Sequence, residues 1–78
     1  MAFSTKPLSV IKHRKPVLIK TLQGEENFRF RLQEYGFIPG AWVSIDSVIG
    51  FGDPVAYSIQ GGKVVLRKED ARYILVEE

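Results

Sequence analysis

The sequence predicts a mainly β domain, a small barrel of five short strands with one internal helix and a short helical turn near the N-terminus. Strand-length runs recur with turn signals at intervals of about ten residues. A chain of 78 residues is too short to build two cores. A closed or nearly closed barrel also avoids the exposed edges of an open sheet. We therefore expect a single domain over residues 1–78.

The first elements are a helical turn and a strand. Leu8 and Ile11 are three positions apart behind Pro7, which suits the first position of a helix. This spacing predicts one or two helical turns. The β-branched run from Val17 to Leu22 then has the length of a strand.

A helix is predicted from Glu25 to Tyr35, because acidic residues stand where a helix N-terminus favours negative charge. Phe28, Leu32 and Tyr35 follow at positions i, i+4 and i+7, which predicts one buried apolar face. Phe30 falls on the other side of this helix. It is expected to be exposed or covered by the N-terminal turn.

The segment from Glu34 to Gly40 turns the chain out of this helix and into the sheet. Gly36 can adopt the left-handed conformation that ends a helix. Pro39 and Gly40 suit the two central positions of a type II turn. These three residues are therefore predicted to have structural roles.

The rest of the chain alternates short strands with turns. Val43 and Ile45 are expected to point inward and Trp42 to lie on the opposite face of its strand. The expected elements are a strand over 43–49, a loop over 50–54, a strand over 55–59, a hairpin turn at Gly61-Gly62, a strand over 63–67, a helical turn over 68–71 and a closing strand over 73–76.

The charge is small but unevenly distributed. The net charge is +2, and the stretch from Lys6 to Lys20 contains no acidic residue. This stretch could attract a nucleic acid, a lipid headgroup surface or an acidic protein face, or it could simply be solvated. There is no cysteine and no apolar run near the ~20 residues of a spanning helix. We expect a cytoplasmic protein that is not inserted in a membrane.

The side chains that support catalysis are scarce. His13 is the only histidine, and it lies in a basic cluster without a nucleophile to activate. The two carboxylate pairs, Glu25-Glu26 and Glu69-Asp70, fall where helix N-termini prefer them. No metal-ligand spacing is present, and the aromatic residues are not interleaved with Lys or Arg. We predict no enzymatic activity, no cofactor, no metal site and no nucleic-acid partner.

A loop aromatic is the leading candidate for partner contact. Phe51 stands between two glycines, and exposed apolar loop tips are typical of contact surfaces. It is expected either to contact another protein or to fold back over the end of the barrel. Phe37 and the basic residues Lys12, Arg14 and Lys15 are alternative contact residues.

Four blocks of the chain resemble the FeoA-type proteins of bacterial ferrous iron uptake. They are Leu32-Gln33-Glu34-Tyr35-Gly36-Phe37-Ile38-Pro39-Gly40-Ala41-Trp42-Val43, Gly52-Asp53-Pro54-Val55, Val64-Val65-Leu66-Arg67 and Ala71-Arg72-Tyr73-Ile74-Leu75-Val76, and together they span about residues 8–77. The basic His13-Arg14-Lys15-Pro16 segment departs from the turn that this family often has before the first strand.

The resemblance implies an SH3-like barrel that acts without catalysis at the membrane transporter FeoB and modulates its cytosolic GTP-binding domain. It implies structural roles for Gly36, Pro39, Gly40 and Pro54. The family is associated with transition metals, but these motif residues are not ligands, so no metal-binding residue is carried over. A nucleic-acid-binding barrel and a metal-sensing module remain the alternatives.

Overall fold

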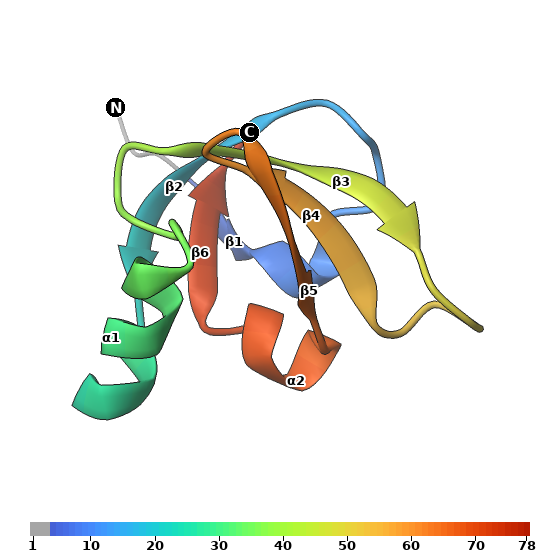
Figure 1. The fold of residues 1–78 in the computed structure, drawn as a ribbon. Helices are drawn as coiled ribbons and strands as arrows, with labels where there is room; N and C mark the ends of the chain where they lie inside the picture. The colour runs from blue at the N-terminus through green and yellow to red at the C-terminus, as the bar shows by residue number, and fades with distance from the viewer. Residues whose placement is uncertain (1–3) are drawn as a thin grey trace.

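The computed structural model describes residues 4–78 and has the predicted mainly β fold (Figure 1). Residues 1–3 of the expected domain lie outside the described residues. In chain order the elements are β1 (Thr5–Pro7), the 3₁₀ turn η1 (Leu8–Val10), β2 (Val17–Leu22), α1 (Glu26–Glu34), β3 (Trp42–Val48), β4 (Val55–Ile59), β5 (Gly62–Leu66), α2 (Lys68–Ala71) and β6 (Ile74–Glu77).

The strands form one antiparallel sheet in the order β1-β6-β2-β3-β4-β5. The register shifts between Ile19 and Thr21 in β2 and between Ile45 and Ser47 in β3. Such irregularities bend strands and increase their twist. The sheet accordingly curls around the core, with α2 below it and α1 below the end of β2 (Figure 1). No helix in residues 4–78 is long and apolar enough to cross a membrane.

The sheet has six strands, so the prediction of five was wrong by one. The additional strand, β1, pairs with β6 at the edge of the sheet. Its residues Thr5, Lys6 and Pro7 show no alternation, and proline is tolerated only at such edges. Pairing with a distant strand, which the local sequence does not reveal, gives this segment its structure.

The core lies inside the curled sheet and confirms the inward direction predicted for Val43 and Ile45, whereas in β4 the alternation is broken because Ala56 is buried as well. Val43 and Ile45 of β3 are buried, as are Val55, Tyr57 and Ile59 of β4. Trp42 faces away from the core and is exposed.

The predicted buried face of α1 is only partly correct. Leu32 is buried, and Phe28 packs against the core with its ring 5.2 Å from that of Tyr73. Tyr35, however, is 54% exposed, so its expected burial was wrong. It is the C-cap residue of α1, where the backbone turns away, and Phe37 enters the core instead. Phe30 is exposed on the other side of the helix.

The turn after α1 has the predicted conformation. The N–H groups of Gly36 and Phe37 donate to the carbonyls of Gln33 and Leu32, which is the hydrogen-bond pattern of a Schellman motif. The N–H of Ala41 then donates to the carbonyl of Ile38 at 3.0 Å, closing a turn around Pro39-Gly40. Positive φ angles at Gly36 (105°) and Gly40 (92°) confirm why glycine is needed.

The hairpin between β4 and β5 turns one residue earlier than predicted. Its central residues are Gln60 (φ 50°) and Gly61 (φ 79°), whereas Gly62 pairs with Ile59 inside the ladder. The double glycine indicated a turn correctly but did not fix its register. A non-glycine residue in the left-handed region is uncommon, and sequence alone gives little reason to expect it here.

Candidate partner-binding surface

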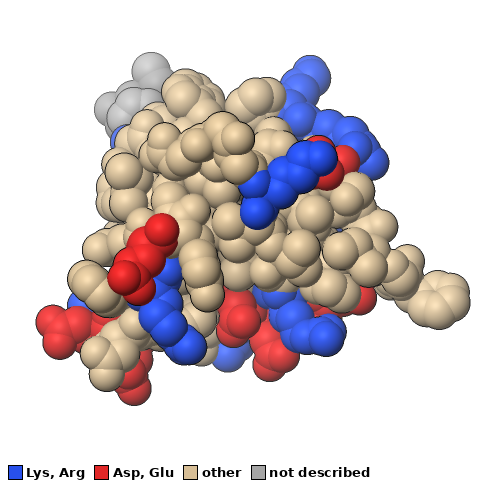
Figure 2. Space-filling model, viewed as in Figure 1, with Lys and Arg blue, Asp and Glu red and all other residues tan. Residues whose placement is uncertain are grey.

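The loop between β3 and β4 presents the most exposed apolar side chain of the described residues. Phe51 has a relative exposure of 109%, so it does not fold back over the barrel. The N–H of Ile49 donates to the carbonyl of Pro54 at 2.9 Å and closes the base of the loop. In Figure 2 the loop projects at the right, and its uncharged side chains stand clear of the rest of the surface. The loop therefore leaves Phe51 fully exposed to solvent.

A small cavity of about 130 Å³ lies at the base of this loop. Its lining includes Gly52 from the loop, Lys12 from the segment after η1 and Lys68 from the start of α2. The contact between α2 and η1 brings these lysines together, although they are far apart in the sequence. The structure thus places one of the predicted basic residues, Lys12, beside the predicted loop, and it adds Lys68.

Charged side chains lie at and beside this cavity and shift the pKa values of their neighbours. The pKa of Lys12 is lowered by the neighbouring Lys68 side chain, because the two like charges repel. The carboxylate of Asp53 accepts a hydrogen bond of 2.9 Å from the backbone N–H of Lys68 and so ties the loop to α2. Burial, with a further contribution from the Asp53 charge, raises the pKa of Tyr57 to about 12. Its phenol is therefore protonated at neutral pH.

The other predicted contact residues lie elsewhere. The Arg14 guanidinium donates to the backbone carbonyl of Asp46 on β3, and the side chain of Lys15 is exposed. Phe37 is 0% exposed and packs edge-to-face against Tyr57, with ring centroids 6.5 Å apart. The prediction of Phe37 as a contact residue was therefore wrong, because the core takes the whole side chain.

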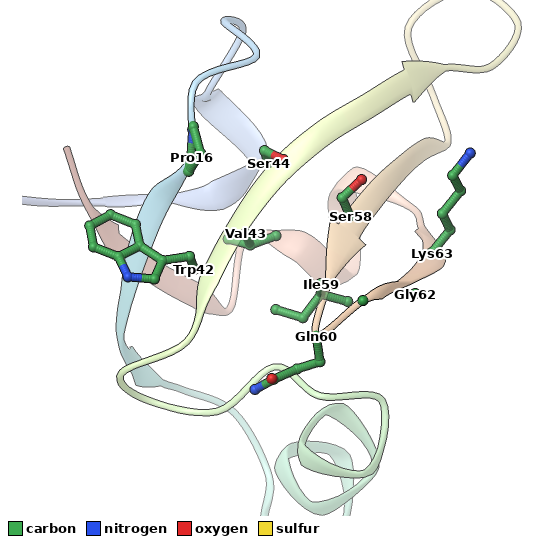
Figure 3. Close-up of a pocket in the computed structure, with 10 residues that line it drawn as sticks. Pro16, Trp42, Val43, Ser44, Ser58, Ile59, Gln60, Gly62 and Lys63 are labelled. Atoms are coloured by element: carbon green, nitrogen blue, oxygen red, sulfur yellow. The ribbon is translucent and has the colours of Figure 1, made fainter.

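A second hollow, of about 400 Å³, lies on the outer face of β3, β4 and β5 (Figure 3). Trp42 and Lys63 stand on opposite sides of it, with the paired Ser44 and Ser58 between them. Trp42 is 61% exposed. The sequence pattern predicts Trp42 on the outer face of its strand, but it does not reveal this hollow, which depends on the β4–β5 hairpin.

The described residues offer little for a metal. Residues 4–78 contain no group of three or more His, Cys, Asp or Glu side chains that could hold an ion. His13 does meet Glu78, with Nε2 2.7 Å from the carboxylate, but the Lys6 ammonium lies 2.9 Å from its other oxygen. Hydrogen bonds from His13 and Lys6 lower the pKa of Glu78. This carboxylate is thus already engaged by two side chains of the chain itself.

The family of this chain is identified by comparison with known proteins. The profile of the FeoA domain family matches residues 6–78. The chain belongs to the FeoA family. The predicted resemblance and the predicted SH3-like barrel are thereby confirmed.

Two proteins that are more than 30% identical to this chain illustrate the family. A Porphyromonas gingivalis protein described as an Fe(2+) transport protein A/Fe(2+) transporter FeoB fusion is 36% identical over 70 residues, which are 90% of this chain and 8% of the relative. The solution structure of iron(II) transport protein A from Clostridium thermocellum is 34% identical, with a TM-score of 0.84, over 91% of this chain and 44% of that one.

The crystal structure of Stenotrophomonas maltophilia FeoA in complex with zinc, described as a prokaryotic SH3 domain protein, has a TM-score of 0.76. It is 22% identical and covers 88% of this chain and 86% of that one. At this identity the likeness shows the fold alone. The chain therefore has the SH3-like fold of a FeoA domain and spans only a small part of the curated fusion protein.

Proposed function

We propose that this chain is a cytoplasmic, non-catalytic accessory protein of bacterial ferrous iron uptake that binds the cytosolic GTP-binding part of a FeoB transporter and modulates its nucleotide cycle or assembly. The observation that carries the proposal is the fusion protein, in which a domain 36% identical to this chain is covalently joined to FeoB. A covalent link raises the effective concentration of two domains that contact each other.

The exposed loop supports a protein partner. Phe51 is an exposed aromatic side chain of the kind that anchors protein–protein interfaces. The face in Figure 2 carries Lys and Arg side chains interspersed with Asp and Glu. A continuous basic stripe, which would favour a nucleic acid, is absent from that face.

Calorimetric titration of the chain into the cytosolic GTP-binding region of the FeoB transporter from the same organism tests the proposal. We expect saturable binding, and Phe51→Ala should weaken it by about tenfold or more, because a central aromatic anchor is removed. The melting temperature should not fall, since Phe51 makes little contact with the core. The matched control is Phe30→Ala, which truncates an exposed phenylalanine on α1.

Two outcomes would contradict this expectation. The absence of binding to the nucleotide-free, GDP-bound and GTP-analogue-bound forms would refute the proposal. The single tryptophan, Trp42, begins β3, whereas Phe51 follows its far end. A change in Trp42 fluorescence together with unchanged affinity of Phe51→Ala would move the contact to the hollow of Figure 3.

A further inference from the structure

The cavity between Lys12 and Lys68 combines two cationic groups with apolar walls. Its apolar lining comes from Ile11, Ile45, Val48, Val55 and Tyr57. Two ammonium groups held side by side without a counter-charge repel each other, so this arrangement does not stabilise the free domain. An anion placed between the two ammonium groups would remove this repulsion.

The described residues do not supply the counter-charge themselves. The ion pairs of residues 4–78 join Lys6 and His13 to Glu78 and Lys63 to Asp46, and none includes Lys12 or Lys68. Asp53 lies in the loop beside the cavity, but its Oδ1 accepts a hydrogen bond from the backbone N–H of Lys68. The two ammonium groups are thus available to an anion from outside.

We propose that this cavity binds a carboxylate of the protein partner, an aspartate or glutamate side chain whose methylene groups contact the apolar walls and whose oxygens lie between Lys12 and Lys68. For the identity of the partner, this inference rests on the proposed function. Gly52 lines the cavity and directly follows Phe51. A partner segment with an apolar residue over Phe51 and an acidic residue nearby would engage both at once.

The shape and chemistry of the cavity favour a carboxylate over a phosphate. A phosphate group presents polar oxygens in all directions, and here it would face Val48, Val55 and Ile45 on the apolar sides. A glutamate side chain matches both the apolar walls and the lysines. Its methylene groups are apolar, and its carboxylate accepts hydrogen bonds from both ammonium groups.

The first test needs no transporter. The ¹⁵N-labelled full chain is titrated with N-acetylglutamate and N-acetylglutamine, each as its α-amide, and with inorganic phosphate, and amide chemical shifts are followed. In the α-amide form the side-chain carboxylate is the only charge of N-acetylglutamate, and N-acetylglutamine is neutral. We expect N-acetylglutamate alone to shift Lys12, Gly52 and Lys68. The double variant Lys12→Gln/Lys68→Gln should lose these shifts. Lys20→Gln, which changes an exposed lysine outside the cavity lining, should keep them.

This titration can overturn the inference in two ways. Unchanged spectra with N-acetylglutamate, or equal shifts with N-acetylglutamine, would exclude a carboxylate site. Shifts of the same amides at lower concentrations of phosphate would show a phosphate site instead. The double variant must also keep its melting temperature, and we expect it to, because it removes a repulsion.

The second test uses the transporter region and separates this inference from the proposed function. The double variant should bind about tenfold more weakly than the wild type, whereas Lys20→Gln should bind unchanged. Equal affinity of the double variant and the wild type would overturn the inference and leave the proposed function standing. Binding of N-acetylglutamate without any binding of the transporter region would support the carboxylate site and refute the proposed function.

Discussion

Phe37→Ala is expected to lower the free energy of unfolding by about 3–5 kcal/mol, the range for deleting a buried aromatic ring. Phe37 is fully buried and contacts the ring of Tyr57, at the centre of the core. Folded domains are stable by only about 5–15 kcal/mol, and a small core lies at the lower end of that range. Urea unfolding followed by circular dichroism measures the change.

Phe30→Ala is the matched control for this substitution. Phe30 is 60% exposed on α1, so its truncation should change the free energy of unfolding by no more than about 0.5 kcal/mol. A loss below about 1 kcal/mol for Phe37→Ala would contradict the central place that the structure gives this ring.

Gly36→Ala is expected to have the second-largest effect, about 2–4 kcal/mol, from backbone strain and overpacking together. Its φ of 105° is unfavourable for any residue with a Cβ atom. A Cβ at this position would also lie 2.9 Å from Cγ of Gln60 and 3.4 Å from Cγ1 of Ile59. The β4–β5 hairpin therefore packs directly over the end of α1.

Gly40→Ala separates the two causes. Gly40 has a similar φ of 92°, but a Cβ there would meet nothing within 4 Å. It should cost only the backbone strain, about 1–2 kcal/mol. In a Gln60→Gly background, Gly36→Ala should cost no more than Gly40→Ala, which a double-mutant cycle measures. Equal costs for the two alanine variants in the wild-type background would show that the hairpin contact is unimportant.

The elements that follow from local sequence patterns were predictable. The β-branched run gave Val17–Leu22 with its correct bounds, and Lys68–Ala71 formed the expected helical turn. Gly36 and Gly40 were predictable because a positive φ has few chemical solutions. These features depend on neighbours within a few residues.

The errors arise where distant contacts decide the structure. Thr5–Pro7 becomes a strand only because β6 lies beside it. Tyr35 and Phe37 are both compatible with burial, and the backbone turn at Gly36 determines which of them reaches the core. Gln60 adopts a positive φ that its residue type does not suggest.

The same distinction applies to the candidate surface. The exposure of Phe51 was one of two alternatives that its glycine neighbours left open, and the structure selected between them. Lys12 was identified by the basic run. Lys68 was missed, because its proximity to Lys12 results from the packing of α2 against η1.

Site-specific crosslinking tests most directly whether the Phe51 loop meets the transporter. The chain contains no cysteine, so Phe51→Cys and Phe30→Cys each introduce one unique site for a benzophenone label. On irradiation with the cytosolic GTP-binding region of FeoB, we predict a crosslink from position 51 and none above background from position 30. Crosslinking from position 30 but not from position 51, or from neither, would contradict the account.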